Sequence, residues 1–150
     1  MRAVVQRVRE ARVLVDRAGI GAIGEGLLVY LGIGNGDADA DLDYLAEKIA
    51  GLRVFRDAAG AMNLSVVDVG GRALVVSQFT LYGDTQRGRR PDFSAAAGPE
   101  IAQALYERVV ARWRETGYRV ATGVFGAHMV VELENDGPVT VIVEREHTGP

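Results

Sequence analysis

The sequence predicts a single α+β domain over residues 1–150, in which a mostly antiparallel sheet, partly closed into a barrel, packs with two main helices. Two observations carry this prediction. Only two segments place apolar residues at helical spacing, and a predicted strand pair separates them, so helices and strands do not alternate regularly. The other apolar segments are short, rich in β-branched residues and mostly joined by short turns, which favours antiparallel neighbours.

The first half of the chain is predicted to contain three strands and one helix. Met1–Val8 and Ala11–Asp16 alternate loosely, so both are expected to be strands, and the DRAG sequence that follows is a turn signal. Gly26–Ile33 is a continuous apolar run of strand length, typical of a strand buried on both faces. Residues 35–55 are expected to hold the first helix, with four apolar positions at helical spacing: Leu42, Leu45, Ile49 and Leu52.

The second half is predicted to contain a strand pair, a helix and two final strands. Met62–Val69 and Arg72–Leu81 are expected to pair across two glycines, and a polar loop follows them. Glu100–Thr116 is expected to be the second helix, with an apolar stripe made of Ile101, Leu105, Val109 and Trp113. The last strands are predicted at His128–Leu133 and Val139–Glu144, and residues 145–150 are expected to be a frayed tail.

The composition excludes several classes of function. The chain has no cysteine, which rules out disulfides, thiolate catalysis and cysteine-ligated zinc, and which fits a reducing cytoplasm. No apolar run approaches the ~20 residues that a membrane span needs, and charge inside the apolar N-terminal run argues against a signal peptide. Because the formal net charge is −3, contact with a nucleic acid requires a local basic patch.

Several motifs point to ligands that their context does not support. GIGAIG at residues 19–24 matches the dinucleotide-binding pattern, but an apolar strand follows where that motif needs a helix. DADAD at residues 37–41 lacks the glycine and glutamate that a calcium loop requires, so we interpret it as helix capping. His128 and His147 lie far apart in sequence, so neither a metal site nor a Ser-His-Asp triad is expected.

Two stretches stand out as candidate functional segments. In VVSQFTLY, strand alternation would put Gln78 and Thr80 on one face of a strand and Ser77 and Phe79 on the other. Either the strand end satisfies these polar groups locally, or they form a small polar pocket whose donors hold an oxyanion. In NDGPVT, the Asp-Gly pair is a strong hairpin signal, and the bond between Gly137 and Pro138 can be cis at modest cost.

These stretches resemble the two signature motifs of the D-aminoacyl-tRNA deacylases: SQFTL at residues 77–81 and NDGPVT at residues 135–140. QRV near the N-terminus, MNLSV at residues 62–66 and RPDFS at residues 90–94 fit the same family, and the resemblance covers residues 1–143. It implies an enzyme that hydrolyses the ester joining a D-amino acid to the terminal ribose of tRNA, and that removes glycine mischarged onto the tRNA for alanine. It also implies a cytoplasmic homodimer that needs no metal or cofactor.

The resemblance further implies roles for individual residues. The catalytic pocket is expected to be lined by four consecutive residues: Ser77, Gln78, Phe79 and Thr80. Gly137 and Pro138 of each subunit are expected to form a cis pair that enters the partner's pocket and rejects L-amino acids sterically. Arg7 resembles the arginine that braces this Gly-Pro loop. Three further family positions, two of them around the terminal adenosine and the ligand, match Phe125, Met129 and Ala102.

The sequence leaves two mechanisms of ester hydrolysis open, and it also leaves two alternative functions open. Thr80 could act as a nucleophile, or the ribose 2′-OH of the tRNA could assist a water, and we favour the second because no His, Lys or Cys lies near Thr80 in the sequence. Three arginines, Arg87, Arg89 and Arg90, are expected to contact tRNA phosphates, although Asp92 suggests that one is paired within the fold. The alternatives are a non-catalytic RNA-binding module and an L-specific editing relative with a trans Gly-Pro arrangement.

Overall fold

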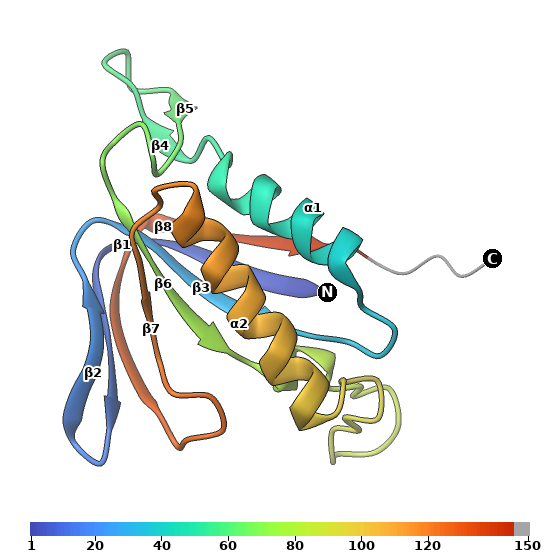
Figure 1. Ribbon diagram of the computed structural model, residues 1–150. Coiled ribbons are helices and arrows are strands. Elements are labelled where there is room, and N and C mark those ends of the chain that lie inside the picture. Colours follow the sequence, from blue (N-terminus) through green and yellow to red (C-terminus); the bar gives the residue numbers. More distant parts are fainter. Residues whose placement is uncertain (146–150) are drawn as a thin grey trace.

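The computed structural model describes residues 1–145, which form one strongly curved sheet with two long helices against one of its faces (Figure 1). The elements, in chain order, are β1 (Arg2–Val15), β2 (Ala18–Ile23), β3 (Gly26–Gly32), α1 (Asp39–Ala50), β4 (Phe55–Arg56), β5 (Met62–Leu64), β6 (Arg72–Ser77), the 3₁₀ helix η1 (Phe79–Tyr82), α2 (Pro99–Glu115), β7 (Val120–Thr122) and β8 (Val130–Glu144). Both predicted helices are confirmed. Among the described residues, no helix is long and apolar enough to cross a membrane.

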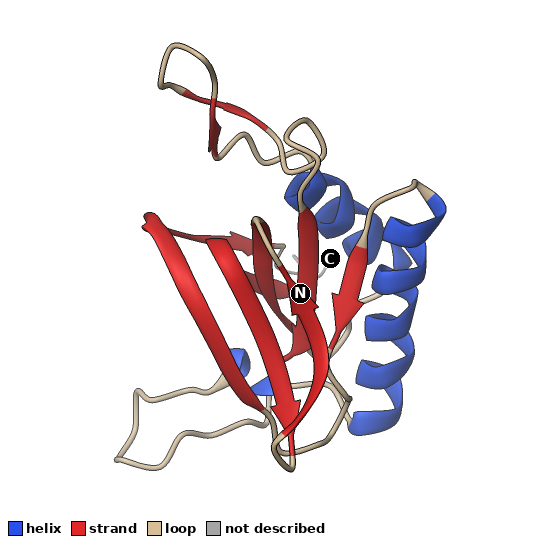
Figure 2. Ribbon diagram, turned by 90° about the vertical axis from the view of Figure 1, so that its left-hand side faces the viewer, coloured by secondary structure: helices blue, strands red, loops and turns tan. Residues whose placement is uncertain are grey.

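The long strand β1 organises the sheet. One of its edges pairs with β8 along most of its length, and the other pairs with β3 in its first half and with β2 in its second half, all antiparallel. Beyond β3 the sheet continues through β6 to β7 in parallel pairs. The sheet then curls back on itself (Figure 2). β2 comes close to the end of β7, since a Cβ on Gly21 would lie 2.5 Å from the carbonyl oxygen of Thr122. The partly closed barrel is therefore confirmed.

The mostly antiparallel prediction is right for the pairs that β1 makes and wrong for the other half of the sheet. The physical reason is the position of the two helices. Along the chain, α1 lies between β3 and β6, and α2 lies between β6 and β7. Each helix runs back along the sheet, so the next strand starts at the same end as the previous one and pairs with it in parallel. The sheet is therefore mixed.

Several predicted strand boundaries are also wrong. Met1–Val8 and Ala11–Asp16 are one continuous strand, and the turn after it is a two-residue hairpin loop in which Asp16 and Arg17 have φ of 51° and 65°. That hairpin leads into β2, which the glycine-rich sequence concealed. The predicted pairing of Met62–Val69 with Arg72–Leu81 does not form, because β5 pairs with β4, while β6 lies between β3 and β7.

The segment Asn135–Thr140 is not a hairpin turn, because it lies inside the continuous strand β8. Gln6 of β1 faces Thr140 and Val8 faces Asn135, so residues 136–139 stand opposite Arg7 alone. The extra residues form a bulge, which we call the Gly-Pro bulge, and the peptide bond between Gly137 and Pro138 within it is cis.

Two apolar clusters cover the two faces of the sheet. The larger one lies between the sheet and the helices, and the buried Trp113 of α2 donates its indole N–H to the carbonyl oxygen of Ala46 in α1, 2.9 Å away. The smaller one fills the inside of the curl, around Val8, Leu28 and Leu74. The continuous apolar run of β3 supplies side chains to both clusters, so the prediction that it is buried on both faces is confirmed.

The predicted helix capping is confirmed for Asp41, which lies in the first turn of α1 and bonds to the N-cap residue Ala38, whereas Asp37 bonds to a residue outside the helix. A carboxylate oxygen of Asp41 accepts the backbone N–H of Ala38 at 2.9 Å, and one of Asp37 accepts that of Gly34 at 2.7 Å. Arg145, the first residue of the predicted frayed tail, forms an ion pair with Asp41 at 3.1 Å. Residues 146–150, His147 among them, lie outside the described part of the chain.

Candidate functional site

A cavity of about 580 Å³ lies at the carboxyl end of β6 and is the candidate site. Its walls come from the end of β6, the start of η1, the loop before α2, the first turns of α2 and the loop before β8. The lining residues are Ile33, Val76, Ser77, Gln78, Phe79, Phe93, Ala96, Ala97, Pro99, Ala102, Phe125, Gly126, Ala127, His128, Met129 and Val131. A mostly apolar cavity with a few polar side chains is typical of a small-molecule site.

The polar groups of the cavity arise where β6 ends. The backbone N–H of Gln78 still bonds to the carbonyl oxygen of Leu31 at 2.8 Å, and η1 begins with the next residue. The chain therefore turns sharply after Gln78, and the predicted strand alternation of Ser77 to Thr80 is wrong. Thr80 is exposed and is not among the lining residues, but its Oγ1 accepts a hydrogen bond from the side-chain amide of Gln78.

The turn into η1 leaves two backbone donors unused. Within residues 1–145, neither the N–H of Phe79 nor that of Thr80 has a hydrogen-bond partner. The first N–H groups of any helix lack a partner inside the helix. Two adjacent free donors, one of them on the cavity-lining residue Phe79, have the chemistry needed to stabilise an oxyanion.

Aromatic rings flank these donors. The Phe79 ring is 54% exposed and meets the Phe93 ring edge to face, with 5.1 Å between their centroids. Phe125 and Met129, from the loop before β8, and Ala102 of α2 also line the cavity. The structure therefore brings together the predicted residues Ser77, Gln78, Phe79, Ala102, Phe125 and Met129.

One residue of the cavity was missed by the sequence analysis. His128, which we expected to take no part in a site, lies in the wall formed by the loop before β8. His128 therefore shares a cavity with Ser77 and Gln78, although Thr80, whose activation was in question, is not among the lining residues. His128 is 51 positions away from Ser77 along the chain (128 − 77), so only the three-dimensional fold reveals that they share a cavity.

The Gly-Pro bulge is exposed and firmly braced. The buried Arg7 donates from Nε to the carbonyl oxygen of Asp136 at 3.1 Å and from Nη1 to that of Val54 at 2.7 Å. The side-chain amide of Asn135 spans the bulge, because its Nδ2 donates to the carbonyl oxygens of both Arg7 and Val139 at 3.0 Å. Arg7 therefore bonds both to the bulge and to the segment just before β4.

Gly137 cannot be replaced by an L-residue without strain. Its φ is +128°, a conformation that L side chains rarely adopt. A Cβ there would lie 2.8 Å from Cγ2 of Val139 and 3.0 Å from Nη2 of Arg7. The bulge is therefore a backbone surface that presents a glycine and a proline to solvent, with no room for a larger side chain at its first position.

The bulge and the cavity are separate within one chain. Neither Gly137 nor Pro138 lines the cavity, whose nearest β8 residue is Val131. Gly137 lies six residue steps along β8 from Val131, which corresponds to about 20 Å of extended strand. The two halves of the site that the resemblance implied thus lie at different places on the monomer.

The loop between η1 and α2 carries the three arginines predicted to contact phosphate. Arg87, Arg89 and Arg90 are all exposed, and none forms an ion pair with another described residue. The expected pairing with Asp92 is wrong. Asp92 instead accepts the backbone N–H of Ser94 at 2.7 Å, and this bond together with the Ser94 side chain holds the pKa of the Asp92 carboxyl below its usual value.

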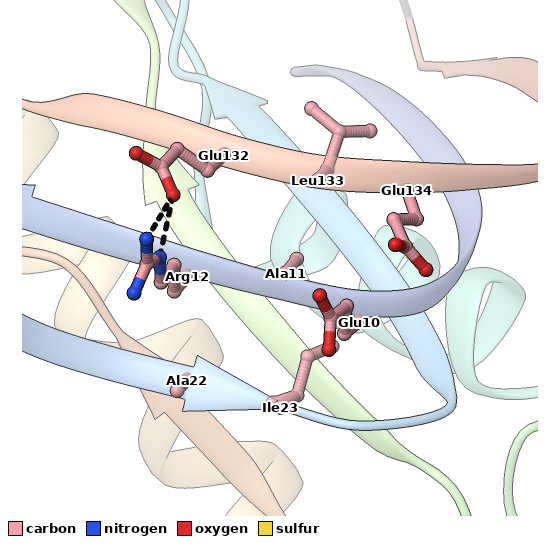
Figure 3. A pocket seen from close by; sticks show the side chains of 8 residues that line it. All are labelled: Glu10, Ala11, Arg12, Ala22, Ile23, Glu132, Leu133 and Glu134. Atoms are coloured by element: carbon pink, nitrogen blue, oxygen red, sulfur yellow. Dashed lines mark hydrogen bonds and ion pairs between the residues drawn. The ribbon is translucent and has the colours of Figure 1, made fainter.

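A second hollow, of about 370 Å³, lies where β2, β1 and β8 run side by side (Figure 3). Glu10 and Glu134 face each other across the β1–β8 pair, and Arg12 forms a 2.5 Å ion pair with Glu132. These charges are solvated cross-strand neighbours. Within residues 1–145, no group of acidic or histidine side chains is arranged to hold a metal ion.

Comparison with known proteins gives a consistent result. Residues 4–144 match the model of the family described as "D-Tyr-tRNA(Tyr) deacylase". A protein of Thermotoga petrophila named "D-aminoacyl-tRNA deacylase" is 57% identical over 144 residues, covering 96% of this chain and 97% of that protein. A protein of the same name from Heliobacterium modesticaldum is 60% identical over 144 residues, covering 96% of each chain.

Two solved structures have the same fold. One, described as "c-Myc DNA Unwinding Element Binding Protein", is 43% identical with a TM-score of 0.92 and covers 97% of this chain and 99% of its own. Another, described as a "probable eukaryotic D-amino acid tRNA deacylase", has a TM-score of 0.76 over 95% of this chain and 97% of its own. At 21% identity, the second likeness concerns the fold alone.

Proposed function

The chain belongs to the D-Tyr-tRNA(Tyr) deacylase family, and we propose that it hydrolyses the carboxylic ester between a D-amino acid and tRNA, as a proofreading step of translation in the cytoplasm. The observation that carries this proposal is the cavity in which Ser77, Gln78 and Phe79 meet Phe125 and Met129. Its apolar walls suit an aminoacyl group and an adenine ring, and its polar end suits an ester. The family model spans almost the whole chain, which supports one catalytic domain.

We propose that the free N–H groups of Phe79 and Thr80 receive the negative charge that develops on the ester carbonyl oxygen. Such donors are most effective where little water surrounds them, and the Phe79 and Phe93 rings add apolar surface to this side of the cavity. Removing one donor of this kind from an enzyme typically costs about 10²–10³-fold in rate. Backbone donors also survive side-chain substitution, so this contribution should persist in Thr80 variants.

The attacking water is proposed to be assisted by the 2′-OH of the terminal ribose. Thr80 is a poor nucleophile here, because its hydroxyl is bonded to the Gln78 amide, which is not a base. A substrate whose 2′-OH is replaced by hydrogen should therefore react much more slowly than the natural ester. Equal turnover of the two substrates would rule out the RNA-assisted route.

Selectivity for D-amino acids is proposed to come from the Gly-Pro bulge of a second copy of the chain in a homodimer. The bulge lies about 20 Å along β8 from the cavity of its own chain, so it can act on a cavity only in trans. A backbone surface excludes the side chain of an L-amino acid but has no means of distinguishing D side chains. Glycine has no side chain to exclude, so glycine mischarged onto the tRNA for alanine is also expected to be a substrate.

Subunit mixing tests the arrangement in trans. One variant carries a disabled cavity (Gln78→Ala) and the other a disabled bulge (Gly137→Ala), and each alone is expected to lose selective deacylation. In mixed dimers formed in trans, one of the two sites combines an intact cavity with an intact bulge, so selective activity returns. If the bulge acted in cis, every site in the mixture would carry one defect and no activity would return.

The exposed arginines of the loop before α2, Arg87, Arg89 and Arg90, are proposed to contact tRNA phosphates near the cavity. Their loop also supplies Phe93 to the cavity wall, so a bound RNA end lies close to them. Arg89→Ala and Arg90→Ala should weaken binding and lower its dependence on salt. Unchanged affinity and an unchanged salt slope would remove these residues from the interface.

A second candidate function is nucleic-acid binding without catalysis. It is favoured by the 43% identical structure whose description names a DNA-binding protein. Deacylation of matched D-, L- and glycyl-tRNA by the purified protein separates the two. Rapid cleavage of the D and glycyl esters with the L ester spared is the expected result, whereas binding without cleavage supports the second function, and equal cleavage of D and L overturns the proposed selectivity.

A further inference from the structure

At the other end of β6 from the catalytic cavity lies a groove with an unusual charge. It has a volume of about 410 Å³, and three arginines line it: Arg72 at the start of β6, Arg114 in the last turn of α2, and Arg119 just before β7. We call it the arginine groove. No carboxylate side chain lines it, and none of its arginines forms an ion pair with another described residue.

Two other arginines of α2 are arranged differently. On the same helix, Arg108 pairs with Asp39 and Arg112 lies 3.7 Å from Asp43. Three unpaired like charges around one groove repel one another, so the groove has a positive potential that attracts an anion. The hydroxyl of Tyr118, which also lines the groove, has no hydrogen-bond partner among residues 1–145.

A third hollow shares lining residues with both the arginine groove and the catalytic cavity. This hollow, which we call the furrow, has a volume of about 320 Å³, and its lining residues come from α2 and from Thr122–Phe125, at the end of β7 and just after it. Phe125 lines both the catalytic cavity and the furrow, and Arg114 lines both the furrow and the arginine groove. The furrow contains one carboxylate, Glu107, which accepts a hydrogen bond from Gln103 at 3.1 Å.

We propose that the 3′ strand of the tRNA lies in this furrow and that the arginine groove binds its backbone phosphate. This inference rests on the proposed function, since it takes the aminoacylated end to be in the cavity. The six residues of β6 span about 17 Å between the two sites. At about 3.4 Å per stacked nucleotide, the contacted phosphate lies roughly five nucleotides from the ester.

The inference gives the two sites separate tasks. The cavity holds the amino acid and the terminal nucleoside, which occur in every substrate, including a minimal one. The arginine groove reads only the presence of a longer RNA strand, because phosphate contacts position a nucleic acid without reading its bases. Removal of the groove arginines should therefore raise KM by an amount that depends on the length of the RNA and not on the amino acid.

The test compares Arg72→Gln/Arg119→Gln with Arg108→Gln/Arg112→Gln, which removes two charges from exposed, paired positions of α2. Arg114 is left unchanged because its Nη2 also bonds to the carbonyl oxygen of Val120 at 3.0 Å. KM is measured for D-tyrosyl-tRNA, for D-tyrosyl oligonucleotides of increasing length and for D-tyrosyl-adenosine. We expect the groove variant to raise KM roughly tenfold for substrates longer than about five nucleotides, with D-tyrosyl-adenosine unaffected.

Direct binding of uncharged tRNA gives a second measurement that does not depend on catalysis. Loss of two contacts to a single strand should reduce the slope of log affinity against log salt by about 1.4. Three results would each overturn the inference. The groove variant could leave both KM and the salt slope unchanged, the Arg108→Gln/Arg112→Gln control could have an equal effect, or KM for D-tyrosyl-adenosine could rise equally. Binding of tRNA that inorganic phosphate displaces at millimolar concentration would also overturn it, because the groove would then be a site for free phosphate. If the wild type cleaves none of the esters, the proposed function fails, and the salt slope still decides the groove.

Discussion

The substitution Gly137→Ala tests whether the Gly-Pro bulge sets selectivity. With φ at +128°, an alanine at this position costs about 1–3 kcal/mol, and its Cβ would also lie 2.8 Å from Cγ2 of Val139. The bulge must shift to relieve this contact. If an L-amino acid enters only when the bulge moves aside, that movement becomes easier by the same 1–3 kcal/mol, so the ratio of D to L deacylation rates should fall about 5- to 150-fold.

The assay measures deacylation of D- and L-tyrosyl-tRNA together with thermal unfolding. For a chain of this size, the same 1–3 kcal/mol lowers Tm by about 2–12 °C. The matched control is Gly60→Ala, in the turn between β4 and β5, where φ is +82° and nothing lies within 4 Å of the added Cβ. It should lower Tm without altering the ratio. A Gly137→Ala protein with lowered Tm and wild-type selectivity would refute the reasoning, as would an equal loss of selectivity in Gly60→Ala.

Three further predictions concern single side chains. Thr80→Ala should retain most of the deacylation rate, because its hydroxyl is bonded to the Gln78 amide and lacks a base; a loss of roughly 10³-fold or more in a folded protein would identify a nucleophile. His128→Asn should keep kcat within about tenfold, and a loss of about 10²–10⁴-fold with KM unchanged would make His128 a general base. Burial raises the pKa of Tyr106 to about 12, so the native state favours its neutral phenol, and this stabilisation is present below pH ~10 and lost as the pH rises toward 12. In Tyr106→Phe, the free energy of unfolding should therefore fall less steeply as the pH rises through that range. The variant should also lose about 0.5–1.5 kcal/mol at neutral pH, because the 2.8 Å bond from the Tyr106 hydroxyl to the Val75 carbonyl oxygen is absent. Thermal unfolding from pH 8 to 11.5 measures both effects.

Local patterns in the sequence predicted the elements whose stability is local. The two helices and β3 follow from periodicity and from a long apolar run, because a helix stripe and a doubly buried strand each require a particular residue pattern. The parallel pairing of β6 could not be predicted in this way. Its apolar residues suit a hairpin with Met62–Val69 as well as they suit a place beside β3, and only the helix crossing between them decides.

The site shows the same division. Ser77, Gln78 and Phe79 attracted attention because polar residues end an apolar strand, which is a local signal. Phe125, Met129 and Ala102 were assigned by resemblance to a family, and no feature of their own surroundings in the sequence distinguished them. His128 was set aside because it has no neighbouring ligand in the sequence, although the loop before β8 brings it into the cavity wall. Contacts between residues that are far apart in the sequence cannot be predicted from the local residue pattern.

The Asp-Gly pair at residues 136 and 137 predicted a hairpin turn, but the structure has a bulge there. This difference bears on the proposed mechanism. A hairpin tip is held at one end only, whereas a bulge inside β8 is paired with β1 on both sides, at Gln6 and at Val8. Exclusion of an L-amino acid can be no stronger than the cost of pushing the excluding group aside. One bond from a charged donor, Arg7 to Asp136, is worth about 1.5–3 kcal/mol, and two from the Asn135 amide are worth about 0.5–1.5 kcal/mol each. Together they set a limit of roughly 2.5–6 kcal/mol, or about 10²- to 10⁴-fold discrimination. A free turn with none of these bonds would move aside far more readily, so the position of Gly137 within a strand is what makes the proposed steric proofreading by a bare backbone physically possible.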